Sequence, residues 1–346
     1  MAHEKARVLI VGTGGVGTMS AYALEQGGKA EVTAVMRSNY DAVAKHGIDI
    51  DSIQYGNDIR GWRPTQIRKN VPDVAAEGLA PFDFVLVTTK NIPDVSPTVA
   101  DIIEPAVTPN KTAIILSQNG LNIETGVVAR FPTNPIISSV SYVGATEKSP
   151  GKILHDDPDV QKIGPFTNPN ISDKVAEDAA KRYIAVYNPH GKLDVSFDAD
   201  VRRVRWRKLV YNASFNPVAT VLRMDTPRMR MSRHVIDDLV RPIILEIIAA
   251  ATACGVTGFP EKLEESVIRA DPVDTEFKPS MCQDVEKGNL LEVENIVGEP
   301  LREGEARGVP MPTLRAIYGL LKGLQLKAKE SKGLWEPKFT EDNPYQ

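Results

Sequence analysis

A glycine-rich turn near the N-terminus constrains the fold more than any other feature of this 346-residue chain. The apolar residues 8–11 lead directly into a G-x-G-x-x-G turn, Gly12-Thr13-Gly14-Gly15-Val16-Gly17, and an amphipathic stretch follows. A strand, a tight glycine turn and a helix in that order are the fingerprint of a dinucleotide-binding βαβ unit. Gly12 permits the turn, Gly14 lets a pyrophosphate approach the backbone, and Gly17 lets helix and strand pack closely. The helix N-terminus would offer unpaired N–H groups to the phosphates.

Short apolar runs alternate with helical patterns through the first half of the chain, which is typical of a parallel sheet. We expect strands at residues 7–11, 31–36, 82–88, 112–116 and 136–141. We expect helices at 15–26 and 95–103, minor strands and a loop between 48 and 78, and short β pieces at 152–155 and 160–163. The pattern predicts an α/β chain whose Rossmann-type doubly wound sheet occupies residues 1–170.

Beyond residue 170, apolar residues recur at helical spacing. The expected helices span residues 173–186, 200–215, 233–254, 261–270, 280–308 with a break, and 313–327. These residues predict an all-helical C-terminal domain, 171–346, that completes the active site. The polar stretch 330–346 is expected to be extended or loosely packed.

Charge and cysteine content narrow the function classes. The formal charge is −4 and the pI about 5.9, so no general attraction to nucleic acid or anionic membrane is expected. The two cysteines, Cys254 and Cys282, lack metal-ligand spacing and suit a reducing compartment. The first apolar run is too short for a signal peptide, and no long apolar stretch occurs. We therefore expect a cytoplasmic protein without nucleic-acid, membrane or metal partners.

The second predicted strand ends at Arg37, about 20 residues after the glycine turn, where an NAD site usually carries Asp or Glu. An acidic residue there binds the ribose 2′-hydroxyl, whereas a guanidinium suits a 2′-phosphate through paired, charge-assisted hydrogen bonds. The sequence therefore favours NADP(H), with a solvated surface arginine as the alternative.

Two further polar residues follow strands of the predicted sheet. Lys90 lies just past the strand at 82–88, and Asn119 lies just past the strand at 112–116. Ligands of open α/β sheets gather at the carboxyl ends of the strands, so both residues are candidate cofactor contacts. For Asn119-Gly120 a simple turn is the alternative.

A polar row stands out in the second half. Lys208, Asn212 and Asn216 are four residues apart, so a continuous helix would place them on one face, and Pro217 would end that helix or let it turn away. Asparagine is a poor helix former, which suggests that the row faces something specific, with a solvent-facing stripe as the alternative. Farther along, Glu292 lies at the edge of an apolar helical stripe and could reach a cleft, although such glutamates are usually solvated.

These residues together resemble the ketopantoate reductase (2-dehydropantoate 2-reductase) family over roughly residues 7–325. The resemblance is carried by the glycine turn, Arg37, Lys90, Gln118-Asn119-Gly120, Lys208-Leu209 with Asn212 and Asn216-Pro217, Ser280-Met281 with Gln283-Asp284, and Glu292 followed by Gly298. It implies hydride transfer from NADPH to the C2 carbonyl of a 2-oxo acid. Ketopantoate would be the substrate and pantothenate biosynthesis the setting.

The resemblance also implies a role for each residue. Lys208 would be the general acid, because an ammonium can both protonate and stabilise the developing alkoxide. Asn212 and Asn216 would orient the lysine and hold polar groups of the substrate. Ser280 would bind the carboxylate, and Glu292 would accept a hydrogen bond from a substrate hydroxyl and contact the nicotinamide ribose.

The cofactor would be held by the first half of the chain. Gly12, Thr13, Gly14, Gly15, Val16 and Gly17, with Arg37 and Lys90, would hold the NADPH phosphates, and Asn119 would touch both cofactor and substrate. The expected active site is a cleft that brings Lys208 close to a carbonyl facing the nicotinamide. A homodimer through the C-terminal helices is compatible with the resemblance.

Some stretches depart from the family pattern. Thr226 lies near the place of a substrate-binding asparagine, and Pro300 interrupts the helix after Glu292, which it should kink or break. Residues 53–76, 188–198 and the tail are longer than in a minimal member. Two other hypotheses therefore remain: a reductase for another 2-oxo acid or ketone, and a non-catalytic NADPH-binding sensor. The basic residues Arg223, Arg228, Arg230 and Arg233 are either a solvated face or an anion site.

Overall fold

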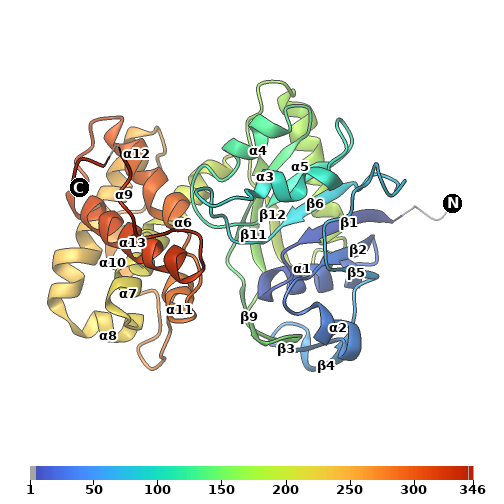
Figure 1. Ribbon diagram of the computed structural model, residues 1–346, viewed down its shortest axis with the longest axis horizontal. Helices are drawn as coiled ribbons and strands as arrows, with labels where there is room; N and C mark the ends of the chain where they lie inside the picture. Colours follow the sequence, from blue (N-terminus) through green and yellow to red (C-terminus); the bar gives the residue numbers. More distant parts are fainter. Residues whose placement is uncertain (1–4, 342, 346) are drawn as a thin grey trace. The chain divides into compact units, whose positions relative to one another are not determined.

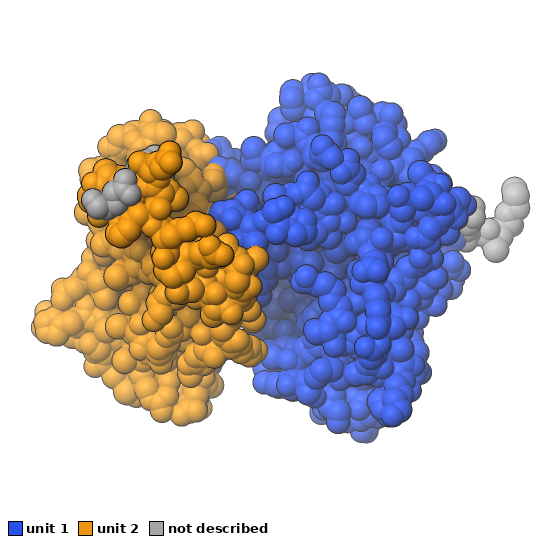
Figure 2. Space-filling model, viewed as in Figure 1, with its two compact units in different colours: residues 1–204 blue, residues 205–346 orange. Residues whose placement is uncertain are grey.

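The computed structural model describes residues 5–341 and 343–345, which form two compact units (Figure 2). The first unit comprises the described residues up to Val204, and the second begins at Arg205. Figure 1 labels most of the helices and strands of both units. The chain is an α/β protein with a largely parallel N-terminal sheet and a helical C-terminal region, as the sequence predicted.

The first unit is built on an eight-stranded sheet in the order β12-β11-β8-β7-β6-β1-β2-β5. Its strands are β1 (Ala6–Val11), β2 (Ala30–Val35), β5 (Gln66–Arg68), β6 (Phe84–Val87), β7 (Ala113–Leu116), β8 (Ile136–Ser141), β11 (Val160–Pro165) and β12 (Asp194–Phe197). All neighbouring pairs are parallel except β8 with β11. The five main strands predicted from apolar runs are confirmed, with ends shifted by two residues or fewer.

Alternation of side chains along the central strands gives this sheet two buried faces. Val8 and Ile10 of β1 face the core beneath α1 (Gly15–Gln26) and α5 (Asp173–Tyr187), whereas Leu9 and Val11 face α3 (Val99–Ile103) and α4 (Thr125–Arg130). The sheet therefore fixes the glycine turn between two packed layers. The remaining helical segments of the unit are α2 (Tyr40–His46) and the 3₁₀ turn η1 (Glu104–Ala106).

The predicted helix at 95–103 starts later than expected. Thr98 caps α3 by accepting from the Asp101 backbone N–H, and the Asp101 carboxylate accepts from the Thr98 N–H in return. This capping box satisfies backbone N–H groups that a helix start leaves unpaired. Pro97 immediately precedes the cap, so the chain enters α3 at Val99.

A smaller sheet in the order β4-β3-β10-β9 packs on α1. Its strands are β3 (Ile48–Ser52), β4 (Gly56–Trp62), β9 (Gly144–Ser149) and β10 (Lys152–Asp157). The irregular region expected between residues 48 and 78 therefore supplies half of a second sheet. Through β9, this sheet also reaches the glycine turn.

The first unit extends past the boundary near residue 170 that the sequence suggested. Helix α5 buries Tyr183 and Tyr187 in the core of the large sheet, and β12 pairs in parallel with β11. Helical spacing alone does not show which hydrophobic core a helix packs into. For this reason the sequence placed residues 171–204 in the helical domain. The structure divides the chain after Val204.

The second unit is helical. Its helices are α6 (Val201–Asn212), which begins in the first unit, α7 (Phe215–Leu222), α8 (Thr226–Met231), α9 (Arg241–Ala253), α10 (Leu263–Ile268), α11 (Ser280–Glu286), α12 (Glu299–Glu305) and α13 (Pro312–Ser331). Helix α9 packs against α10, α12 and α13, and α7 packs against α11 and α13. No helix among the described residues has the length and apolarity needed to cross a membrane.

Two π-helical turns each run directly into an α-helix whose second residue is proline. They are η2 (Val235–Val240), before Pro242, and η3 (Glu294–Gly298), before Pro300. Proline lacks the N–H of a regular helical bond, and a wider turn accommodates that loss. The predicted break at Pro300 is thus a π turn, after which the helix continues.

Candidate active site

The glycine turn after β1 is shaped by close backbone packing. Gly12 has a φ of +105°, a conformation that disfavours any side chain, and a Cβ on Gly17 would collide with the Gly12 carbonyl oxygen. A Cβ on Gly15 would collide with the carbonyl oxygen of Ala145 in β9. At Gly14, by contrast, no atom beyond its chain neighbours lies within 4 Å of the position that a Cβ would take, so the backbone is open on that side.

Side chains fasten this turn to the strands around it. The Thr13 hydroxyl donates to the Val35 carbonyl at 2.6 Å, and the Asn39 amide donates to the Thr13 carbonyl at 2.8 Å. Asn39, which is buried, also donates to Glu147 of β9 at 2.9 Å. The Thr88 hydroxyl donates to the Gly12 carbonyl at 2.6 Å. Sequence patterns do not assign these supporting roles to Asn39, Thr88 and Glu147, because only the tertiary fold brings them to the turn.

The other predicted cofactor residues follow neighbouring strands at the same edge of the sheet. Arg37 comes after β2, Lys90 after β6 and Asn119 after β7, and these strands flank or lie near β1. Arg37 and Lys90 are exposed and Asn119 is half-buried. Within the described residues the Arg37 guanidinium makes no ion pair, so it is available to an anion from solution.

A dinucleotide phosphate fits this edge of the first unit. The open side of Gly14 lies at the N-terminus of α1, where unpaired N–H groups and the helix dipole favour an anion. No acidic residue occupies the end of β2, where Arg37 stands. The residues present therefore suit a nucleotide that carries a pyrophosphate and a 2′-phosphate.

In the second unit the predicted polar row is divided between two helices. Lys208 and Asn212 lie on α6, which ends at Asn212, whereas Asn216 lies in the first turn of α7. At the break the Ser214 hydroxyl donates to the carbonyl of Val210 at 2.6 Å. Pro217 ends neither helix, so that one of its two predicted roles is wrong. It lies within the first turn of α7, where its missing N–H costs no bond.

Lys208 is held in an environment that disfavours its charge. Burial and the nearby guanidinium of Arg205 lower the pKa of Lys208 to about 8, while the Glu292 carboxylate acts in the opposite direction. Desolvation and a like charge destabilise an ammonium, and an opposite charge stabilises it. A lysine with a pKa near neutrality can exchange a proton at physiological pH, as a general acid must.

Asn216 joins two of the predicted substrate-binding segments. Its side-chain oxygen accepts from the Met281 backbone N–H at 3.1 Å, which fixes the first turn of α11 beside α7. Ser280 is the first residue of α11 and is exposed, whereas Asn212 and Asn216 are buried. The structure thus brings Asn216 and Ser280 together within the second unit.

Glu292 is buried and stands just before the π turn η3. The side chain of Gln325 in α13 forms two hydrogen bonds with the backbone of Leu291, the residue before Glu292. It accepts from the Leu291 N–H at 2.9 Å and donates to the Leu291 carbonyl at 3.1 Å. Gln325 is itself buried. This pair of bonds sets the backbone from which Glu292 projects, and no local sequence signal marks it.

Comparison with known proteins identifies the chain's relatives. The family profile described as "Ketopantoate reductase PanE/ApbA" matches residues 8–168, and its C-terminal counterpart matches residues 200–325. The chain belongs to the ketopantoate reductase family. Its members are NADP-dependent oxidoreductases that act on CH–OH groups, and this chain is accordingly an NADP(H)-dependent oxidoreductase.

Individual relatives of this ketopantoate reductase family member cover nearly the whole chain. An uncharacterized protein of Saccharomyces cerevisiae is 37% identical over 95% of this chain and 96% of its own length. The crystal structure of 2-dehydropantoate 2-reductase from Methylococcus capsulatus is 31% identical, with a TM-score of 0.76, over 93% of this chain and 97% of that one. A D-mandelate dehydrogenase solved with NADH and anilino(oxo)acetate shares the fold at 18% identity and a TM-score of 0.76, over 93% and 99% of the two chains.

Proposed function

We propose that this protein reduces a 2-oxo acid to the 2-hydroxy acid with NADPH, and that ketopantoate is the substrate. The observation that carries the proposal is Lys208, half-buried, with its pKa lowered to about 8 beside Glu292. NADPH, when bound, supplies the hydride that adds to C2 of the substrate. Every other step falls to the protein's own side chains.

Lys208 donates a proton from Nζ to the carbonyl oxygen of the substrate as negative charge develops there. Asn212 and the amide nitrogen of Asn216 orient the lysine and the substrate's polar groups. The Ser280 hydroxyl binds the carboxylate, and Glu292 accepts a hydrogen bond from a hydroxyl of the substrate. The turn from Gly12 to Gly17, with Arg37, Lys90 and Asn119, holds the cofactor.

Purified protein with NADPH and ketopantoate tests this proposal through the loss of NADPH absorbance. Lys208→Ala should lower kcat by about 10²–10⁴-fold, the usual contribution of a general acid. Lys174→Ala, which removes an exposed lysine of α5, is the matched control and should leave the rate unchanged. Turnover without a Lys208 effect would reject the assigned acid. NADPH binding without turnover of any ketoacid would favour a sensor instead.

A different 2-oxo acid is the second candidate, and Thr226 favours it. Thr226 lies near the place where the resemblance expects a substrate-binding asparagine, but it is fully buried and its N–H donates to the Phe277 carbonyl at 3.0 Å. A threonine committed to the fold of α8 cannot replace an asparagine amide in a substrate loop. A panel of 2-oxo acids, including phenylglyoxylate, would identify the substrate by kcat/KM.

A further inference from the structure

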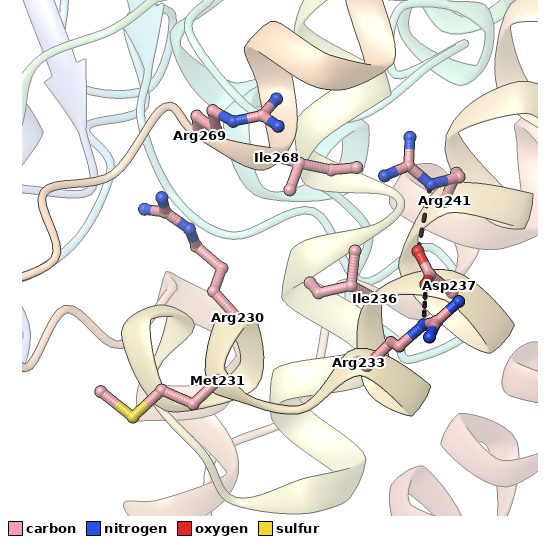
Figure 3. Close-up of a pocket in the computed structure, with 8 residues that line it drawn as sticks. All are labelled: Arg230, Met231, Arg233, Ile236, Asp237, Arg241, Ile268 and Arg269. Carbon is pink, nitrogen blue, oxygen red and sulfur yellow. Dashed lines mark hydrogen bonds and ion pairs between the residues drawn. The ribbon is translucent and has the colours of Figure 1, made fainter.

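An arginine-rich pocket in the second unit is not used by the proposed reaction. It has a volume of about 370 Å³ and is formed by α8, η2, α9 and the end of α10 (Figure 3). Four arginines, one aspartate and three apolar residues line it: Arg230, Met231, Arg233, Ile236, Asp237, Arg241, Ile268 and Arg269. Two of these arginines, Arg230 and Arg233, belong to the basic stretch for which the sequence allows either a solvated face or an anion site.

Three of the arginines are connected by shared carboxylates. Asp237 accepts from Arg233 at 3.1 Å and from Arg241 at 3.3 Å. Glu265 in turn pairs with both Arg241 and Arg269. Two carboxylates thus link three guanidiniums, and the array keeps an excess positive charge.

Arg230 adds a further positive charge without a carboxylate partner among the described residues. Its Nη1 donates to the backbone carbonyl of Asp271 at 2.6 Å, which orients the guanidinium but does not neutralise it. The four arginines with Asp237 and Glu265 therefore carry a formal charge of +2. A solvated face of simple ion pairs would be close to neutral, whereas this pocket is complementary to a dianion.

The middle of the pocket is apolar. Ile236 and Ile268, which are 7% and 6% exposed, lie between Arg230 on the left and Arg241 on the right in the view of Figure 3. Met231 lies at the rim and is 78% exposed. A ligand that fills this space needs an anionic group for the guanidiniums and a small apolar part for the isoleucines.

We propose that this pocket binds a small organic phosphomonoester. Guanidinium forks match the oxygens of a phosphate, and a phosphomonoester at neutral pH carries close to two negative charges, as the pocket requires. The volume is in the range of small-molecule sites, and the site is separate from the residues assigned to NADP(H) and to the 2-oxo acid.

Phenyl phosphate is the probe for this proposal, because it joins a phosphomonoester to a compact apolar ring. Titration calorimetry on full-length protein saturated with NADP⁺ keeps the probe away from the cofactor phosphates. We expect one saturable site whose affinity exceeds that for inorganic phosphate and falls as salt is added. Arg230→Ala should weaken binding about tenfold, because one charge-assisted hydrogen bond is lost. Arg230→Lys keeps the positive charge but lacks the forked guanidinium, so its affinity for phenyl phosphate should lie between those of the parent and Arg230→Ala.

Arg228→Ala is the matched control, because Arg228 lies on the same helix but pairs with Asp225 and Glu276 outside the pocket. It should bind phenyl phosphate like the parent protein. The absence of saturable binding, or equal binding by Arg230→Ala and the parent, would overturn the site. Glutarate binding more tightly than phenyl phosphate would overturn the phosphomonoester class, and inorganic phosphate binding equally well would overturn the role of the isoleucines. Circular dichroism of each variant verifies that it is folded.

Discussion

The side-chain oxygen of Asn216 accepts a hydrogen bond from the backbone N–H of Met281, 3.1 Å away. This bond is buried and connects α7 to α11, so one atom of a proposed substrate-binding residue is committed to the fold. Only the amide nitrogen of Asn216 is then left to act on a substrate. Structural and functional roles of the residue can be separated because they use different atoms.

Replacing Asn216 in two ways should separate these roles. Asn216→Ala leaves the buried Met281 N–H unpaired and should lower the free energy of unfolding by about 1–3 kcal/mol. Asn216→Asp keeps the accepting oxygen, so its stability should be closer to that of the parent. Both should raise KM for the 2-oxo acid, since both lose the amide N–H. Urea unfolding and steady-state kinetics measure the two effects, and an unchanged KM in Asn216→Asp would remove this residue from the substrate site.

The pKa of Lys208 predicts the pH dependence of the reaction. A general acid must be protonated, so kcat/KM for reduction should fall as the pH rises through about 8, by tenfold per unit beyond that point. Oxidation of the hydroxy acid needs the neutral amine and should rise through the same pH. Glu292→Gln removes the negative charge that raises the Lys208 pKa, so the midpoint should move to lower pH. A midpoint that stays in place or moves upward would contradict the coupling between these residues.

Two neighbouring glycines should respond differently to alanine. Gly14→Ala places its methyl in open space, so the protein should keep its thermal stability but lose NADPH affinity, because the methyl occupies the approach of the pyrophosphate. Gly17→Ala drives a Cβ into the Gly12 carbonyl and should lower Tm as well. Differential scanning calorimetry without cofactor, and fluorescence titration with NADPH, provide the comparison. Unimpaired NADPH binding by Gly14→Ala would exclude a phosphate at this turn.

Arg37 should determine which nicotinamide cofactor is preferred. Arg37→Ala should raise KM for NADPH by tenfold or more, because charge-assisted bonds to the 2′-phosphate are lost, and should leave KM for NADH nearly unchanged. Arg60→Ala, an exposed arginine of β4 paired with Asp51, is the control for loss of one surface charge. Equal effects on the two cofactors would mean that Arg37 does not contact the 2′-phosphate.

The sequence predicted those parts of the fold that depend on local periodicity. The strands around the glycine turn and helix α1 follow from apolar spacing, and the carboxyl ends of β2, β6 and β7 carry the polar residues expected there. The break of the polar row at Ser214 was not predicted, because a hydroxyl that competes for helix carbonyls leaves the spacing of Lys208 and Asn212 unchanged.

The residues that support the candidate site through hydrogen bonds could not be predicted, for a different reason. Gln325 holds Leu291 across 34 positions, and Asn39 meets Glu147 across 108 positions. Bonds of this kind join segments that only the tertiary fold brings together, and a buried Gln or Asn carries no periodic signal of its own. The assignment of α5 to the first unit depends in the same way on the core that receives Tyr183 and Tyr187.

The two buried tyrosines of α5 offer a matched test of that core. The Tyr187 hydroxyl donates to the carboxylate of Asp159, a buried group whose pKa is raised by desolvation and partly restored by the bonds from Tyr187 and Gln161. The Tyr183 hydroxyl, four residues earlier, is buried with no hydrogen-bond partner among the described residues. Tyr187→Phe should therefore lower the free energy of unfolding by about 2–3 kcal/mol, because it leaves a buried carboxylate oxygen without its donor.

Tyr183→Phe removes an unsatisfied hydroxyl at nearly constant volume, so it should be neutral or stabilise the protein by up to about 1 kcal/mol. The difference between the variants should depend on pH. Because the folded-state pKa of Asp159 is raised, this carboxyl is least costly to bury when protonated, and its contribution to stability is lost as the pH rises through that pKa. The Tyr187→Phe penalty should accordingly shrink in acid. Urea unfolding at neutral and acidic pH measures both effects, and equal penalties for the two tyrosines would show that the Tyr187–Asp159 bond contributes nothing specific to the core.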